Sequence, residues 1–393
     1  MYRVRPVKVL EVYLWGRRLG ALTLDSPYGT VFQYDPAFVK SGFEIAPFEM
    51  PLNGAPYRFA DFNLPRGVFS GLPGVFADSL PDSFGNALVR QWMAENGVSD
   101  TRLSALDRLA YIGSRGMGAL TYEPDFKPYA GPPFALDMRK LTQTARAALN
   151  GSLSSLSGPD ALREIIRVGT SAGGAQAKAI VAWNPATSTF LAGQDNLPDG
   201  FEHWLVKFSP EEDPAQGERE FAVYERAVAS GINMSESRLF ELDGVKHFMT
   251  RRFDRNGSRR HLVQTYCALR HLPPAAPARL STYEGLFDTA VGLGLDYPSL
   301  EELFRRMAFN VLINECDDHS KNFSFMRREG GEWELAPAYD LTGVHDSSEW
   351  GDFTSRHALS VNGKFSSITD DDLLTVAARF GINTAPKILR QLT

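Results

Sequence analysis

Hydrophobic and polar positions alternate with a period of two at the start of the chain. Successive side chains of residues 7–14 lie on opposite faces of an extended strand, and both faces carry apolar groups. Turns follow at residues 16–20 and 27–29, where glycine and proline occur. The pattern predicts a β-rich start to the chain, with a sheet that is covered on both faces.

Helical signals follow this alternation. One helix is predicted to begin near residues 81–82 and to end at Gly97, and a second to begin with Asp100 as its N-cap and to end at Gly113. Residues 123–133 contain four prolines, which neither a helix nor a central strand accommodates. We therefore expect a linker there.

The rest of the chain mixes both patterns. After a helix over residues 136–149, strands are predicted at residues 165–168, 178–183 and 204–208. From about residue 283 the pattern is mostly helical, with one β-like stretch at residues 322–340. The predicted fold class is α/β, of the mixed α+β kind.

The chain of 393 residues is too long for one core, because single cores stop growing at roughly 250–300 residues. The patterns predict a β-rich N-terminal subdomain at residues 1–125. A lobe with a Gly-rich loop is predicted at residues 126–255, and a mostly helical lobe at residues 256–393.

Charge and cysteine content narrow the class of protein. The chain has 41 Lys and Arg against 47 Asp and Glu, a net charge of −6, and its basic residues are dispersed. This disfavours nucleic acid as a direct substrate, although a DNA-binding partner remains compatible. Two cysteines fit a reducing compartment and argue against a structural zinc site. Neither a signal peptide nor a membrane span is predicted, so we expect a soluble cytoplasmic protein.

The most informative motif follows an apolar stretch that reads as a helix. Asp317 and Asn322 are five positions apart, the D-x-x-x-x-N spacing of a protein-kinase catalytic loop. In that loop the Asp accepts the proton of the substrate hydroxyl, and the Asn holds a metal ion. In isolation, this motif would be better explained as a solvated polar turn after a buried helix.

A second acid follows the loop at the end of the β-like stretch. Asp340 stands where a kinase places its second magnesium ligand, and an oxygen-rich pair suits Mg²⁺, which takes its remaining ligands from phosphate and water. The alternative for Asp340 alone is the N-cap of a helix.

A Gly-rich stretch at residues 169–178 lies between two predicted strands. Glycines let backbone N–H groups approach phosphate oxygens, as in a kinase-type lid. Ala175 follows Gly174 where a Walker A motif requires Lys, so a Walker loop is excluded. A Gly-rich hairpin connection would have a similar sequence.

Lys207 lies within an otherwise apolar predicted strand, where a cation requires an anion. A predicted helix starting near Glu218 offers Glu220, and a Lys–Glu pair at the ATP phosphates is typical of kinases. A lysine on an edge strand that reaches water is the alternative. Together, the Gly-rich loop, Lys207, Glu220, the Asp317 loop and Asp340 occur in the order found in kinases.

These motifs resemble those of the HipA-like serine/threonine kinases, the toxins of bacterial type II toxin–antitoxin modules. The matching stretches are residues 80–85, 113–120, 171–178, 205–208, 252–255, 317–322 and 336–340, with Glu220 before Gly231. The resemblance covers about residues 5–345. It implies a protein-kinase-like two-lobe fold with the extra N-terminal subdomain, and ATP bound between the two lobes.

The resemblance also implies the roles of individual residues. Asp317 would be the catalytic base, Asn322 and Asp340 the magnesium ligands, and Ser171 the site of autophosphorylation. The residues expected to bind the nucleotide are Ala172, Gly173, Gly174, Ala175, Gln176, Ala177, Lys178, Lys207, Glu220, Arg251, Arg252, Phe253, His319, Lys321, Asn322, Tyr339 and Asp340.

The cofactors implied by the resemblance are ATP and Mg²⁺. The implied partners are a protein substrate, such as an aminoacyl-tRNA synthetase or another translation factor, and a small helix-turn-helix antitoxin of the HipB type. Through that antitoxin the protein would reach operator DNA. Many family members have a basic or proline-containing end to the Gly-rich stretch, whereas this chain has Gln176 and Ala177, so substrate preference is not carried over.

Three alternatives stay open from the sequence. A small-molecule kinase of the aminoglycoside-phosphotransferase type would share the Asp317 loop and Asp340, but the N-terminal subdomain argues against it. A metal-dependent hydrolase built on Asp317, Asp318 and His319 would need three or more convergent ligands. A non-catalytic co-repressor would have no need for both Asp317 and Asp340.

Overall fold

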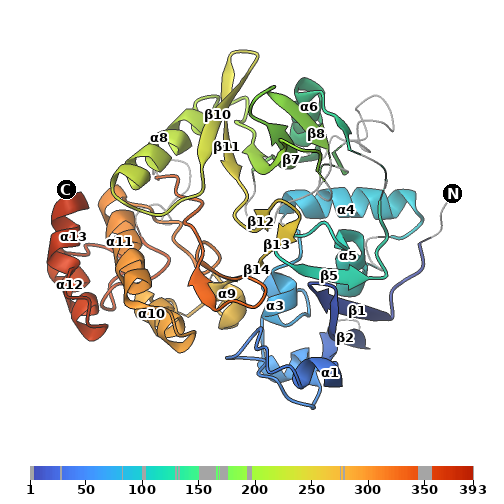
Figure 1. Ribbon diagram of the computed structural model, residues 1–393, viewed down its shortest axis with the longest axis horizontal. Coiled ribbons are helices and arrows are strands. Elements are labelled where there is room, and N and C mark those ends of the chain that lie inside the picture. The colour runs from blue at the N-terminus through green and yellow to red at the C-terminus, as the bar shows by residue number, and fades with distance from the viewer. Residues whose placement is uncertain are drawn as a thin grey trace. The chain divides into compact units, whose positions relative to one another are not determined.

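The computed structural model describes residues 4–26, 29–81, 83–99, 103–128, 131, 133–149, 165–166, 168, 176–192, 197–274, 276–277, 279–343 and 356–392. Two compact units make up the chain (Figure 1). The first consists of Met1–Glu218 and Ser237–Leu262, and the second of Arg219–Glu236 and Val263–Thr393. Each unit is thus built from two separate stretches of chain. The predicted three-part division at residues 125 and 255 stays a prediction.

The first unit begins with a five-stranded antiparallel sheet. Its order is β4 (Tyr57–Arg58), β3 (Gly29–Tyr34), β2 (Arg17–Ser26), β1 (Val9–Leu14) and β5 (Leu120–Glu123). The β-rich start is confirmed. Leu10, Val12 and Leu14 are buried, but Val9 on the opposite face is 53% exposed. The expectation of two covered faces is therefore wrong for β1, since an antiparallel sheet can leave one face in water.

Helix α5 (Ala105–Ile112) contacts strands β1, β2 and β5. Its N-cap is Ser104, which forms a capping box with Asp107, so the predicted cap at Asp100 is wrong. Asp107 also accepts a hydrogen bond from the Val7 backbone N–H at 2.8 Å, which joins the helix to the chain before β1. The predicted end at Gly113 is confirmed. An added Cβ there would overlap the Asp125 carboxyl group.

A six-stranded antiparallel sheet forms the other part of the first unit. Its order is β10 (Ser237–Leu242), β11 (Val245–Arg251), β9 (Glu202–Lys207), β7 (Lys178–Asn184), β8 (Thr189–Ala192) and β6 (Phe134–Ala135). The helices α4 (Ser83–Glu95) and α6 (Met138–Leu149) share one apolar core with this sheet. Trp92 of α4 and Trp204 of β9 are among the core residues. The strands predicted at residues 178–183 and 204–208 are confirmed.

Residues 165, 166 and 168 are helical, so the strand predicted there is wrong. Their side chains are 0–1% exposed within the core shared by α4 and α6. A short apolar run that is buried on every side has no periodicity that separates a strand from a helix. The Gly-rich loop therefore does not follow a strand, as predicted, but a helical segment.

Short elements connect these layers of the first unit. They are α1 (Pro36–Val39), η1 (Phe59–Phe62), α2 (Arg66–Phe69), α3 (Gly74–Ala77), β12 (Arg255–Asn256) and β13 (Arg259–Arg260). Among the described residues, no helix is both long enough and apolar enough to span a membrane.

The second unit is mostly helical, as predicted from about residue 283 onwards. Its elements are α8 (Gln216–Ala229), β14 (Leu262–Thr265), α9 (Tyr266–Leu269), α10 (Tyr283–Gly292), α11 (Tyr297–Ile313), β15 (Ser324–Arg327), β16 (Trp333–Leu335), α12 (Asp370–Arg379) and α13 (Ala385–Leu392). The central helix α11 contacts α10 and α13 (Figure 1). The predicted β-like stretch is confirmed as β15 and β16, which form a three-stranded sheet with β14 in the order β14, β15, β16.

A buried ion cluster joins the two sheets of the first unit. The Asp254 carboxylate, 0% exposed, accepts bonds from Arg252 at 2.7 Å and Arg255 at 2.5 Å. It also accepts a bond from the Gly118 backbone N–H at 2.8 Å, and Arg255 donates to the Gly116 carbonyl at 2.8 Å. Burial alone would raise the pKa of Asp254, but the two guanidinium groups lower it well below its usual value.

We expect Asp254→Asn to lower the free energy of unfolding by about 3–5 kcal/mol, because it leaves two buried guanidinium groups without their anion. Asp25→Asn is the matched control. Asp25 pairs with Arg58 at 2.8 Å on the surface, with side chains 42% and 48% exposed, and its loss should cost about 0–1 kcal/mol. Urea denaturation of both variants is the measurement, and equal losses would contradict the role given to the cluster.

Candidate functional site

The candidate site begins where α11 ends. Asn314 caps this helix in the left-handed conformation, with a φ of 55° that asparagine tolerates better than most residues. The Glu315 N–H then donates to the Asn310 carbonyl at 2.8 Å. The chain therefore leaves the helix abruptly, and the loop of residues 315–322 lies over the helix end.

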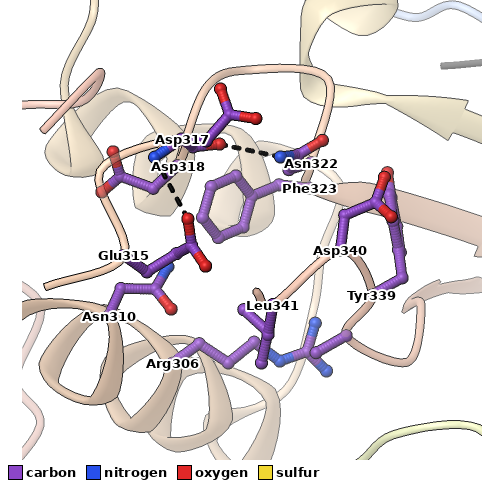
Figure 2. Close-up of a pocket in the computed structure, with 11 residues that line it drawn as sticks. Arg306, Asn310, Glu315, Asp317, Asp318, Asn322, Phe323, Tyr339, Asp340 and Leu341 are labelled. Atoms are coloured by element: carbon purple, nitrogen blue, oxygen red, sulfur yellow. Dashed lines mark hydrogen bonds between the residues drawn. The ribbon is translucent and has the colours of Figure 1, made fainter. Parts of the chain in front are cut away.

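This loop, α11 and the segment around Asp340 enclose a pocket within the second unit (Figure 2). The pocket is lined by Arg306, Asn310, Glu315, Asp317, Asp318, Asn322, Phe323, Ala338, Tyr339, Asp340 and Leu341. Figure 2 shows Asn322 and Asp340 next to each other on one side, with Asn310 and Glu315 on the opposite side. The structure thus brings together the three residues expected to perform catalysis and to bind the metal.

The Asp317 side chain is 69% exposed, and its closest ionic neighbour is His319, whose Nε2 lies 3.7 Å from Oδ1. Partial desolvation in the pocket raises the pKa of Asp317, and the carboxylates of Asp340 and Asp318 add to this effect, while His319 opposes it. Nδ1 of His319 is buried and has no hydrogen-bond partner among the described residues. Asp317 is therefore an accessible carboxylate beside a polar atom that could still accept or donate a bond.

Asn322 is oriented by the same loop that it closes. Its Nδ2 donates to the Asp317 carbonyl at 2.8 Å, and its backbone N–H donates to the His319 carbonyl at 2.9 Å (Figure 2). Because the amide nitrogen is used inside the loop, the amide oxygen is the end of the side chain that remains to bind a ligand.

Asp340 has a φ of 52°, in the left-handed region that is uncommon for residues other than glycine. The neighbouring Tyr339 hydroxyl donates to the Lys321 carbonyl at 2.7 Å, which joins this segment to the Asp317 loop. Residues 341–343 are not helical, so Asp340 is not the N-cap of a described helix. Strained backbone of this kind is typical of functional positions.

Metal ligands are few in the pocket. No group of three His, Cys, Asp or Glu side chains converges on a possible metal position in the part of the chain that the structure describes. Asn322 and Asp340 are the oxygen ligands that could hold Mg²⁺, a cation that usually takes only one or two protein carboxylates.

Two acids of the loop were not assigned a role from the sequence. Glu315 and Asp318 are each 1% exposed. Glu315 accepts backbone bonds from Asp317, Thr342 and Gly343, while burial raises its pKa. Asp318, considered above as a hydrolase ligand, instead accepts bonds from the Tyr283 hydroxyl at 2.7 Å and the Ala358 N–H at 2.7 Å. In the sequence, the indication that Glu315 and Asp318 contribute to the site was their position beside Asp317.

Two predicted nucleotide-binding lysines face each other in the first unit. Lys178 on β7 is directly opposite Lys207 on β9, and they are 4% and 6% exposed. The Nζ of Lys207 also lies 5.6 Å from the centre of the Phe248 ring. Strand β9 is central in its sheet, so the alternative of an edge-strand lysine is wrong.

The other predicted residues of the first unit have local partners. Gln176 donates to the Phe208 carbonyl at 3.2 Å, and Ala177 accepts from the Phe208 N–H at 2.8 Å. Arg251 pairs with Glu202 at 3.1 Å on the surface. Arg252 belongs to the buried Asp254 cluster, and Phe253 is partly buried.

Glu220 is 4% exposed on α8 and belongs to the second unit, whereas Lys207 belongs to the first, so their ion pair stays a prediction. Ser171 and Ala172–Ala175 lie outside the described residues. The predicted roles of these residues remain predictions.

Two family models and two curated proteins match the chain. The model of the HipA N-terminal domain matches residues 10–123, and the model of the HipA-like C-terminal domain matches residues 170–393. Two proteins of Sinorhizobium fredii, "Putative kinase Y4dM" and "Putative kinase Y4mE", are each 24% identical to the chain. These alignments cover 95% and 98% of this chain and 86% and 89% of the relatives.

A solved structure gives the same answer for the fold. HipA of Shewanella oneidensis, in complex with HipB and its operator DNA, superposes with a TM-score of 0.69. The match covers 98% of this chain and 88% of that one, at 18% sequence identity. The predicted mixed α/β fold class is therefore confirmed. With more than half of its length matched by the model of the C-terminal domain, the chain belongs to the family of HipA-like proteins.

Proposed function

We propose that the protein is an ATP- and Mg²⁺-dependent kinase that phosphorylates serine or threonine on a protein substrate. The observation that carries the proposal is the 2.8 Å bond from Asn322 Nδ2 to the Asp317 carbonyl, with Asp340 in the same pocket. A loop acid, an oriented Asn and a second acid are the parts that a kinase uses to position a hydroxyl and a metal-bound phosphate.

The residues present fit magnesium and nucleotide. The Asn322 amide oxygen and the Asp340 carboxylate are hard oxygen ligands, and Mg²⁺ bound there would neutralise charge that develops on the transferred phosphate. These features favour a phosphate-bearing ligand over a closed metal centre.

Asp317 would accept the proton of the attacking hydroxyl. Its carboxylate is exposed enough for a hydroxyl on the surface of another protein to reach it. Its raised pKa makes it a stronger base than an ordinary aspartate. Glu315 and Asn322 form hydrogen bonds to the backbone N–H and carbonyl of Asp317, and these bonds fix the position from which its carboxylate extends.

Lys178 and Lys207 would bind the phosphates. Their register on adjacent strands brings two buried cationic side chains to one place in the sheet, an arrangement that suits a multiply charged anion. A nucleotide triphosphate supplies such an anion. We therefore assign the phosphate contacts in the first unit to these two lysines, with Glu220 as the predicted partner of Lys207.

The proposed partners follow from the family. The Shewanella protein was solved with HipB and operator DNA, and we propose that this chain likewise binds a small helix-turn-helix antitoxin and reaches DNA through it. The net charge of −6 agrees with indirect rather than direct DNA contact. A protein of translation, such as an aminoacyl-tRNA synthetase, is the proposed substrate.

Labelled ATP incubated with purified protein and cell lysate tests the function directly. A phosphorylated protein band is the expected result, and mass spectrometry then identifies the substrate. Labelling confined to small metabolites would instead favour the aminoglycoside-phosphotransferase alternative, and an absence of transfer would favour a co-repressor.

Asp317→Ala and Asp340→Ala should each lower phosphate transfer by roughly 10²–10⁴-fold or more while the protein stays folded, because both acids serve the reaction. Asp317→Ala should still bind ATP. Transfer rates and circular dichroism are the measurements, and Glu329→Ala, on an exposed turn of the same unit, is the control. Wild-type turnover in pure Asp317→Ala would refute the assignment of the base.

Lys207→Ala should weaken ATP binding about 10- to 100-fold, since the lost contact is between a cation and phosphate. Glu220→Ala should weaken it less. Lys246→Ala is the matched control, because Lys246 lies on β11 but pairs with Glu218 at the surface. Calorimetric titration measures the affinities, and unchanged binding by Lys207→Ala would remove this lysine from the nucleotide site.

Ser171 should become phosphorylated when the wild-type protein is incubated with ATP and Mg²⁺. The added charge of about −1.5 to −2 beside a triphosphate should then lower ATP affinity. Peptide mass spectrometry compares the wild type with Ser171→Ala and Asp317→Ala. Equal phosphorylation of Ser171 in Asp317→Ala would show that another kinase modifies it.

A further inference from the structure

Two buried carboxylates flank Asp317, and neither belongs to the machinery proposed above. Glu315 precedes Asp317 by two positions and Asp318 follows it by one. Each is 1% exposed, in contrast to the exposed side chain of Asp317 between them. Burying a carboxylate is costly unless hydrogen bonds compensate it, so the partners of these two acids indicate what they do.

Glu315 joins the Asp317 loop to the chain just after Asp340. Its Oε2 accepts bonds from the backbone N–H groups of Thr342 at 2.6 Å and Gly343 at 2.8 Å. Its Oε1 accepts a bond from the Asp317 N–H at 3.2 Å (Figure 2). One side chain therefore fixes the catalytic loop and the segment of the metal ligand at the same time.

Asp318 joins the same loop to residues 357–359. Its Oδ1 accepts bonds from the N–H groups of Ala358 at 2.7 Å and Leu359 at 3.4 Å, and its Oδ2 lies 2.9 Å from Nδ1 of His357. Oδ2 also accepts a 2.7 Å bond from the hydroxyl of Tyr283 on α10.

The Tyr283 hydroxyl in turn accepts a 3.0 Å bond from Asn310 Nδ2 on α11, so the loop is tied to both helices through Asp318. Burial, with the nearby Asp318 carboxylate, raises the pKa of Tyr283 well above its usual value. Its hydroxyl therefore stays protonated and donates to Asp318.

The two anchors together hold two places of the chain that are 14 residues apart, Gly343 and His357, against the loop of residues 315–322. Asp317 lies between them. Within the described parts of the chain, the nearest ionic contact of its own side chain is the 3.7 Å approach of His319. The position of its carboxylate is set through its backbone, whose N–H donates to Glu315 and whose carbonyl accepts from Asn322.

We propose that Glu315 and Asp318 are positioning residues for phosphate transfer, which hold Asp317 at a fixed place relative to Asp340. This inference rests on the proposed kinase function. A misplacement of about 1 Å at a reacting group can cost about 10²-fold in rate. Loss of either anchor therefore slows transfer without weakening the binding of ATP, whose contacts lie on other residues.

Glu315→Gln and Asp318→Asn are the informative variants, because they keep the volume of each side chain. The new amide N–H₂ group faces backbone or hydroxyl donors, so at least one bond of each anchor is replaced by a donor opposite a donor. Asp372→Asn is the matched control. Asp372 is also buried in the second unit, at 4% exposure, and it accepts bonds from Lys364 and Asn362, but it does not line the pocket.

Single-turnover transfer from labelled ATP to the protein itself or to a substrate found in lysate gives two quantities, the maximal rate and the ATP concentration at half-maximal rate. We expect Glu315→Gln and Asp318→Asn to lower the maximal rate about 10- to 100-fold with less than a twofold change in half-saturating ATP. Asp372→Asn should lose stability alone, with the rate per folded molecule unchanged.

The outcomes separate the two proposals. A wild type that transfers no phosphate overturns the kinase function and this inference with it. An active wild type with unchanged maximal rates in both anchor variants overturns the inference alone, as does an equal loss of rate in Asp372→Asn. If Asp318→Asn fails to fold, His357→Ala takes its place, because it removes only one of the donors to Asp318. It should slow transfer several-fold, and an unchanged rate overturns the role of Asp318.

Discussion

The site depends on the abrupt end of α11 at Asn314. A helix that continued by one more turn would carry Asp317 along the helix surface, away from Asn322 and Asp340. The left-handed residue turns the chain back, and the buried face of α11 holds the turning point in place through Leu303, Phe304 and Met307. The apolar packing of one helix thus fixes where a polar loop begins, and all later geometry of the pocket follows from that point.

The four acids that line the pocket differ in burial and in role. Glu315 and Asp318 have exchanged water for backbone and side-chain donors, so they are rigid and committed to the structure. Asp317 and Asp340 keep their carboxylates at the pocket, where a ligand or a proton can reach them. Glu315, Asp317, Asp318 and Asp340 line one pocket, and like charges that close together repel one another. Hydrogen bonds that stabilise two of them allow the other two to remain near each other.

Much of this site could be predicted from the sequence because kinase chemistry requires a fixed spacing within one loop. Asp317 and Asn322 are local to each other, and Asp340 follows after a single hairpin, so order along the chain was enough to bring them together. The anchors could not be predicted in the same way. The partners of Glu315 and Asp318 lie about 27 and 40 positions away, and only folding shows that both acids are buried.

Some elements of the fold were predicted correctly and others were not, because local sequence patterns do not show how distant elements pack. The alternation of residues 7–14 identified a strand. Which face of its sheet is exposed to water, however, depends on which other elements pack against that sheet. Ile165, Ile166 and Val168 are apolar and β-branched, a composition that suits a strand, yet they are helical and buried in the core that also contains α4 and α6. The cap of α5 had a readable signal in Ser104 followed three positions later by Asp107, the spacing of a capping box.

The Asp254 cluster determines where this chain could be cut into separately folding fragments. The two family domains match residues 10–123 and 170–393, which suggests a cut between them. Yet Arg255 donates to carbonyls of Gly116 and Gly118, and Trp92 of α4 shares a core with Trp204 of β9. A fragment beginning at residue 170 would expose charged guanidinium groups and one apolar face of the six-stranded sheet to water. Homology boundaries and folding boundaries therefore differ in this protein, and truncation at the former would yield an insoluble half.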